Sequence, residues 1–177
     1  MNTIQRNGNY FQNFDEAVMR FLAIPEWKFL KQTNEIDSFF KYILLENKAI
    51  IQRICEKYGL NESLFTYERF LTICTAENIR VSREEMPKLR KSIQGFYGYD
   101  AQGKFIWLKP SLKGIKLLLV AAHELGHNFF HTEKMRSGLL RKPMAFQRNG
   151  DATIEILMAE AEADFFACLL LVQTEVQ

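Results

Sequence analysis

Two histidines and a glutamate stand close together in the run His123-Glu124-Leu125-Gly126-His127. On an α-helix, residues four positions apart project from one face, so both imidazoles can give a nitrogen to a single Zn²⁺. Glu124 is not needed as a ligand. It can instead hold a metal-bound water and accept its proton, which makes that water a nucleophile near neutral pH. The spacing therefore predicts metal-assisted hydrolysis.

The same residues also allow a purely structural interpretation, in which a buried helix uses its histidines to bond backbone carbonyls. Residues 117–122, which precede the motif, form a continuous apolar run. An unpaired carboxylate buried in such surroundings is costly, or it takes up a proton. We therefore favour the metal-binding interpretation.

A third metal ligand is expected on the last helix of the chain, because a catalytic zinc takes three protein ligands and leaves its fourth position to water. Acidic residues stand there at positions 160, 162 and 164. Glu160 and Asp164 share a face at a spacing of four, whereas Glu162 points away. We predict Glu160 as the ligand and Asp164 as a carboxylate that accepts the free N–H of a ligand histidine. Glu162 is expected to be a solvated surface charge.

His131 is the third and last histidine, four residues after His127. It is not expected to share an ion with His123, because eight residues of helix separate the two by about 12 Å along the axis. Two interpretations stay open. His131 either lines the cleft and donates a hydrogen bond to the tetrahedral intermediate, or it pairs with Glu133 or with solvent.

The pattern around these residues predicts an α+β fold, mostly helical, with a small antiparallel β-hairpin packed beside the metal-binding helix. Residues 93–99 and 104–108 are rich in aromatic and β-branched side chains and are joined by a loop of hairpin type. A short strand is expected at 79–81, a brief helix at 84–91, and Ser111 can cap the metal-binding helix.

The second hairpin strand has a predicted mechanistic use. An extended peptide can pair with a strand edge, so that main-chain hydrogen bonds hold it while side-chain pockets select its sequence. We expect residues 104–108 to supply this edge, with Phe105, Ile106 and Trp107 lining the substrate cleft. The alternative is an ordinary twisted hairpin covered by the N-terminal helices.

Two further segments carry open interpretations. Residues 1–60 are predicted to form helices with aromatic stripes, which belong to the core or, alternatively, form a docking groove or a dimer face. Residues 132–151 connect the two helices of the metal site with little periodicity, and they form either a lid over the substrate or a solvated loop.

Composition indicates a compact protein without selecting its function. The 177 residues are 47% hydrophobic, which is enough for a domain with a sizeable core. The 23 basic and 21 acidic residues are interspersed, so no basic stripe argues for direct nucleic-acid binding.

Cys55, Cys74 and Cys168 are expected to be reduced core residues. Neither a signal peptide nor a membrane-spanning run is visible, so we expect a cytoplasmic protein.

A family resemblance rests on two motifs taken together. The run from His123 to His127, followed by Glu160-Ala161-Glu162-Ala163-Asp164-Phe165-Phe166-Ala167 and the pair Leu169-Leu170, resembles the ImmA/IrrE family of zinc metallopeptidases. The second motif of that family reads Glu-x-x-Ala-Asn/Asp-x-Phe-Ala and ends in a Leu-Leu pair. The hairpin at 95–108 also looks like the strand hairpin that precedes the family's active-site helix.

The resemblance implies that His123, His127 and Glu160 bind zinc and that Glu124 is the general base. It implies a zincin-like metallopeptidase domain at 61–177, after an N-terminal helical extension at 1–60 that can also be integral to the core. The implied ion is Zn²⁺, with Mn²⁺ left open. The implied partner is a protein substrate, a helix-turn-helix repressor of a mobile element or of a stress response.

One departure from the family limits the comparison. The family commonly continues past its Leu-Leu pair through Met-Pro into further helices, whereas this chain reads Leu171-Val172 and stops at Gln177. Substrate contacts made by such helices are therefore expected to be absent. An alternative function stays open, in which the chain is a weakly catalytic or non-catalytic protein that sequesters its partner. The sequence does not indicate an oligomeric state.

Overall fold

The computed structural model describes residues 19–21, 23, 50–60, 64–86, 89, 91–137 and 154–172. The chain divides into two compact units, one formed by Phe65–Ala167 and the other by Met1–Leu64 with Cys168–Gln177. In the second unit, residues 50–57 are helical and Gly59 follows them with a positive φ of 59°. Most of the predicted N-terminal extension, its aromatic stripes and the proposed dimer face lie outside the described residues, as does the larger part of the predicted lid.

The unit Phe65–Ala167 contains a three-stranded sheet in the order β1-β3-β2. β2 (Gly95–Asp100) and β3 (Gly103–Leu108) form the predicted antiparallel hairpin, in which Tyr97 lies opposite Ile106. β1 (Ile79–Ser82) pairs in parallel with the other side of β3. The α+β prediction is confirmed, with a mixed sheet in place of a purely antiparallel one.

The position of β3 corrects one prediction. Because β1 and β2 both pair with it, β3 is the central strand and has no free backbone edge for a peptide. Ile106 and Trp107 are also buried, and the Trp107 indole donates a hydrogen bond to the backbone of Glu84. The prediction that residues 104–108, which include Phe105, Ile106 and Trp107, supply a substrate-binding edge is therefore wrong.

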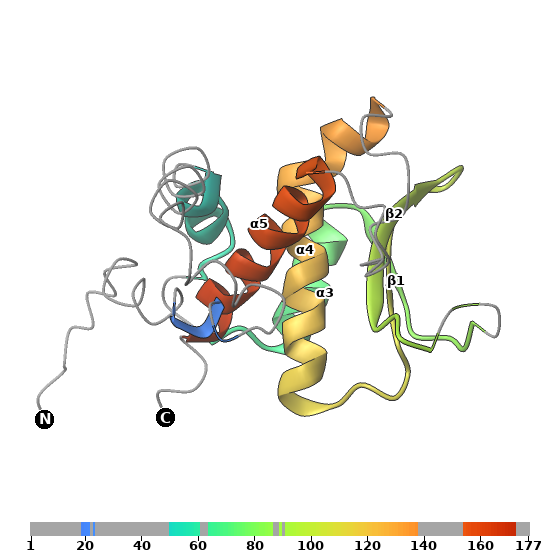
Figure 1. The fold of residues 1–177 in the computed structure, drawn as a ribbon, viewed down its shortest axis with the longest axis horizontal. Coiled ribbons are helices and arrows are strands. Elements are labelled where there is room, and N and C mark those ends of the chain that lie inside the picture. Colours follow the sequence, from blue (N-terminus) through green and yellow to red (C-terminus); the bar gives the residue numbers. More distant parts are fainter. Residues whose placement is uncertain are drawn as a thin grey trace, which may run out of the picture. The chain divides into compact units, whose positions relative to one another are not determined.

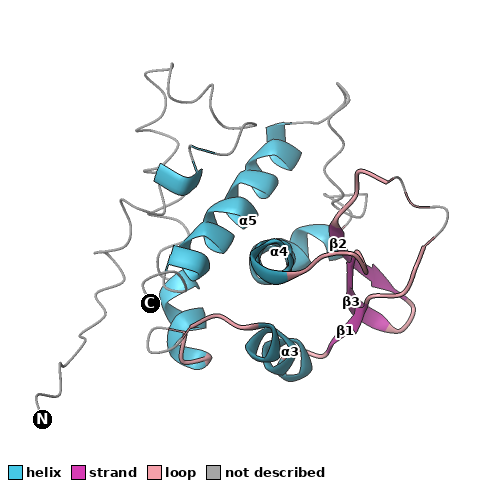
Figure 2. Cartoon of the chain, turned by 90° about the horizontal axis from the view of Figure 1, so that it is seen from below, coloured by secondary structure: helices cyan, strands magenta, loops and turns pink. Residues whose placement is uncertain are grey.

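Among the described residues, two helices contact this sheet, and a third lies beyond them. α3 (Tyr67–Ala76) begins after Thr66, whose hydroxyl accepts a hydrogen bond from the Arg69 backbone, and it contacts both β1 and α4. α4 (Gly114–Arg136) carries the first motif, and α5 (Ile154–Val172) carries the second. α4 lies between the sheet on one side and α5 on the other (Figures 1 and 2).

Local details differ from the prediction at two turns. α4 begins after Lys113, so Ser111 is not its cap. The brief helix predicted at 84–91 is absent from residues 83–86, where the Ser82 hydroxyl instead accepts a hydrogen bond from the Glu84 backbone and forms a turn. The rest of that prediction falls partly outside the described residues.

The middle of α4 is buried because it has neighbours on both sides. Ala121, Ala122 and Leu125 are inaccessible to solvent, as are Tyr97 and Ile106 of the sheet. Cys55, Cys74 and Cys168 are buried and form no disulfide, as predicted. Within the part of the chain that the structure describes, none of the helices has the length and apolar character needed to cross a membrane.

Candidate metal centre

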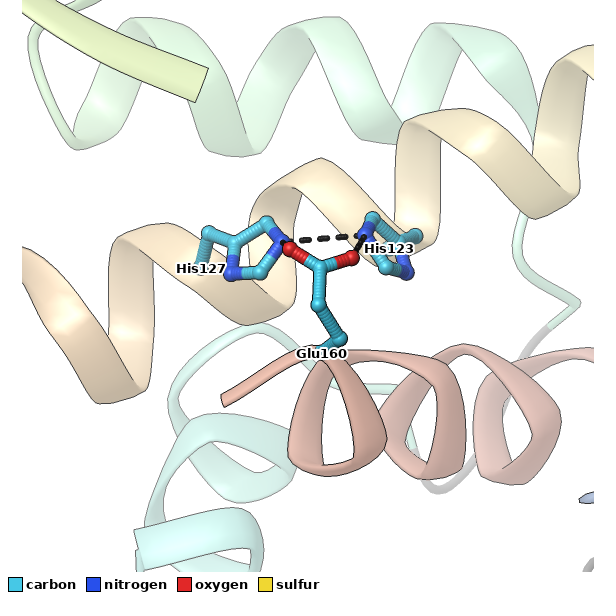
Figure 3. Close-up of side chains that lie close together, drawn as sticks. All are labelled: His123, His127 and Glu160. Carbon is cyan, nitrogen blue, oxygen red and sulfur yellow. Dashed lines mark hydrogen bonds and ion pairs between the residues drawn. The ribbon is translucent and has the colours of Figure 1, made fainter. Parts of the chain in front are cut away.

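Three predicted ligands converge between α4 and α5. The Nε2 atoms of His123 and His127 lie 2.9 Å apart. Glu160 reaches them from α5, with one oxygen 3.4 Å from His123 Nε2 and the other 3.6 Å from His127 Nε2. Figure 3 shows the carboxylate directed at both rings. Together the three residues form a group that can hold a metal ion, with one ligand atom from each lying within 4.8 Å of the others.

The chemistry of this group fits a divalent cation. Two imidazole nitrogens and one carboxylate are a ligand set that zinc accepts, and three protein ligands leave a position for water. Glu160 Oε1 is buried and has no hydrogen-bond partner, which is costly for a carboxylate unless a cation compensates it. A metal-binding interpretation explains this oxygen, whereas a purely structural one leaves it unsatisfied.

Asp164 lies against the outer nitrogen of His123, as expected from its spacing. Its Oδ1 is 2.7 Å from His123 Nδ1, so the ring can donate its Nδ1 proton and keep Nε2 free. Burial by itself would lower the pKa of His123, but the carboxylates of Asp164, Glu160 and Glu124 together outweigh burial and raise that pKa well above its usual value. The neighbouring His127 has its pKa held well below the usual value, first by burial and then by the two other histidines.

Glu124 is buried beside this group but is not part of it. Only 2% of the residue is exposed, and its Oε2 has no hydrogen-bond partner. Burial raises the pKa of Glu124 to about 8, with His123 acting against the shift and Glu160 adding to it. At neutral pH such a carboxyl is largely protonated, and a cation held by the neighbouring ligand group would favour the ionised form that a general base needs.

Two residues of β2 that the sequence analysis did not single out contact Glu124. The Tyr97 backbone N–H donates a hydrogen bond to its carboxylate. A Cβ built on Gly95 would come within 2.9 Å of Glu124 Oε1 and 2.5 Å of a Val120 methyl carbon, so only glycine fits there. A glycine at the start of a strand next to the metal-binding helix was a usable signal, because such glycines mark a close approach.

Glu162 contradicts its prediction as a solvated surface charge. Only 6% of the residue is exposed, and its carboxylate lies 2.8 Å from His131 Nε2. The prediction from helical spacing failed because α5 is buried on nearly every side between residues 159 and 167. A side chain that points away from Glu160 therefore does not reach water.

His131 is also placed differently from both of its predicted environments. It is fully buried and neither lines an open cleft nor pairs with Glu133, which contacts Arg136. Its ring lies between Glu162 and His127, with its Nδ1 3.0 Å from His127 Nδ1. All three histidines of the chain thus belong to one connected cluster.

A comparison with curated proteins finds a similarity to a phage protein. The chain is 34% identical over 85 residues to "Uncharacterized immunity region protein 2" of Bacillus phage phi105. The match covers 48% of this chain and 47% of that protein, so the chain spans about half the length of the curated relative it matches. No family model and no solved structure matches the chain.

Proposed function

We propose that this chain is a zinc-dependent endopeptidase of the ImmA/IrrE type. The observation that carries the proposal is a group of three converging ligand side chains with a fourth, buried carboxylate next to it. His123, His127 and Glu160 direct their ligand atoms at one another, while the buried carboxylate of Glu124 lies beside them without being part of the group. A structural metal site has no use for that fourth residue, whereas hydrolysis needs a base.

Each residue has a distinct task in the proposed reaction. His123, His127 and Glu160 would hold a Zn²⁺ ion, which supplies Lewis-acid polarisation and acidifies water when bound. Glu124 accepts a proton from the attacking water and passes it to the leaving amine, so the amide is cut without a covalent intermediate. Asp164 keeps the His123 ring oriented through its Nδ1. Burial raises the pKa of Glu124, and a bound cation would oppose that shift, so that the ionised carboxylate can accept the proton and then return it.

The proposed substrate is a helix-turn-helix repressor of a mobile element or of a stress response. Two facts support a protein substrate of this kind. The sequence resembles a peptidase family whose known members act on such repressors, and the chain is similar to a phage protein whose name places it in an immunity region. The reaction then removes a repressor by cutting it at one site, inside the cell.

The proposal is tested by comparing protein termini in host cells that express the wild type, Glu124→Gln or Glu133→Gln, read by mass spectrometry. Glu133→Gln is the matched control, because it makes the same substitution at an exposed position of the same helix. One or two new termini in a helix-turn-helix protein are expected with the wild type and with Glu133→Gln only.

The other outcomes are equally informative. Cuts that persist in Glu124→Gln would show that Glu124 is not the base. If all three proteins fold and bind zinc but produce no new termini, the chain is better explained as a binding protein that sequesters its partner. Co-purification of the same partner with the wild type and with Glu124→Gln would then be expected.

A further inference from the structure

A hydrogen-bonded chain leads from the metal centre into the interior of the unit. His127 Nδ1 lies 3.0 Å from His131 Nδ1, and His131 Nε2 lies 2.8 Å from Glu162 Oε2. Both histidine rings are fully buried and Glu162 is nearly so. Residues His127 and His131 come from α4 and Glu162 comes from α5, so the chain also joins the two helices that form the metal centre.

The positions of the protons in this chain follow from simple donor and acceptor rules. With Glu162 ionised, its carboxylate only accepts hydrogen bonds, so the hydrogen in its contact with His131 is on His131 Nε2. A neutral imidazole carries one N–H, which leaves His131 Nδ1 as an acceptor. The hydrogen between the two Nδ1 atoms must therefore belong to His127. Its Nε2 is then left with a free lone pair.

The other tautomer of neutral His131, with its proton on Nδ1, is unfavourable. A proton on its Nδ1 would leave its Nε2 lone pair facing a carboxylate oxygen at 2.8 Å, which places two acceptors against each other. It would also require His127 to accept at Nδ1 and carry its proton on Nε2, where Glu160 and His123 converge. A protonated Nε2 cannot bind a metal ion.

We propose that Glu162 and His131 are positioning residues that fix His127 in the Nδ1-protonated tautomer and so prepare its Nε2 for the metal ion. This inference rests on the metal centre of the proposed function. The two histidine ligands then differ in how they are oriented. The Asp164 carboxylate contacts Nδ1 of His123 directly. The Glu162 carboxylate instead orients His127 through the imidazole of His131.

The proton positions are measured directly by ¹⁵N NMR of the histidine-labelled, metal-free protein near neutral pH. The chain has 3 histidines, so the spectrum contains the nitrogen signals of only three imidazole rings. We expect His127 to be protonated on Nδ1 and His131 on Nε2. His127 protonated on Nε2, or a His131 ring that carries both protons, would overturn the proposal.

A pair of variants separates positioning from packing. His131→Asn keeps an amide oxygen where the ring has Nδ1, so it can still accept from His127, whereas His131→Leu fills the space without an acceptor. Zinc affinity is measured by competition with a chromophoric chelator, after circular dichroism confirms that both metal-free variants are folded. We expect His131→Leu to lose about 10- to 100-fold in affinity and His131→Asn to retain most of it.

Equal losses in the two variants, or no loss in either, would contradict the proposal. The test also remains separate from that of the proposed function. If the wild type bound no zinc, the proposed function would fail, yet the NMR of the metal-free protein would still decide the tautomer. If zinc bound and peptides were cut but His127 carried its proton on Nε2, only this inference would fail.

Discussion

Gly126 lies so close to Ala163 that a Cβ on Gly126 would come within 2.9 Å of the Ala163 Cα. The glycine is the fourth residue of the first motif on α4, and the alanine follows Glu160 by three residues on α5. Because backbone is on the opposing side, no rotation of a side chain can make room for a larger residue. This contact therefore sets the distance between the helix that provides two ligands and the helix that provides the third.

Gly126→Ala is expected to weaken the metal centre from outside the ligand set. The added methyl must push α5 away and carry Glu160 with it, so we expect at least a tenfold loss of zinc affinity. Overpacking of this kind also costs about 1–3 kcal/mol of stability. Zinc competition and thermal unfolding of the metal-free protein measure the two effects separately.

The double variant Gly126→Ala with Ala163→Gly provides the control for this prediction. Removing the Ala163 methyl relieves the contact of 3.2 Å with its Cβ but leaves the closer contact with its Cα. Zinc affinity should therefore be restored only in part. Full affinity in the single variant would show that the close approach does not control the ligand geometry.

Gly95→Ala is expected to impair turnover while leaving zinc bound. The new methyl would meet Glu124 Oε1 and a methyl of Val120, which displaces the proposed base but none of the three ligands. We expect the rate on an identified substrate to fall tenfold or more, since a positioned base contributes about 10²–10⁴-fold.

Gly98→Ala is the matched control for that variant. It introduces similar crowding in the same strand, but against the ring of Phe105, where the nearest atom would be 2.8 Å away. Stability should fall in both variants, whereas turnover per folded molecule should fall in Gly95→Ala alone. Equal rates in the two variants would show that Gly95 has no special relation to Glu124.

Cys74 is expected to be unreactive in the folded protein. Burial raises the pKa of its thiol from 9.0 to about 12, against a smaller opposing influence of Lys104. Since the folded state favours the neutral thiol, this stabilising contribution is complete below the unfolded pKa of 9.0 and is lost as pH rises through about 12.

Alkylation checks this prediction. At pH about 8 the thiolate population should be roughly a thousandfold lower than in an unfolded chain, because thiolate is the reactive form. Iodoacetamide should therefore modify the peptide that contains Cys74 only in denaturant, as read by mass spectrometry. Rapid modification under native conditions would mean that α3 opens readily or that the thiol is more accessible than its burial indicates.

The parts of the fold that the sequence predicted are those encoded by local spacing. The four-residue separation of His123 and His127 and the same separation of Glu160 and Asp164 each define one face of one helix, and the structure brings these two faces together. The hairpin was also predictable, since both strands and their loop are contiguous in the chain.

The parts that could not be predicted depend on contacts between distant segments. β1 joins β3 across a long stretch of sequence, and no local pattern indicates that this pairing covers the second edge of β3. Glu162 belongs to a residue type that is usually exposed. It contacts His131 because α5 is buried around it, which the sequence does not indicate. Helical periodicity shows which residues share a face but not what that face contacts.

The number of zinc ions bound per chain tests the central claim most directly. It is measured by elemental analysis after dialysis against limiting free zinc, for the wild type, Glu160→Gln and Glu124→Gln. The wild type and Glu124→Gln should each retain one ion, because Glu124 lies beside the ligand group without belonging to it. Glu160→Gln should retain little or none. A Glu160→Gln protein that holds zinc as well as the wild type, or a folded wild type that holds none, would contradict the account.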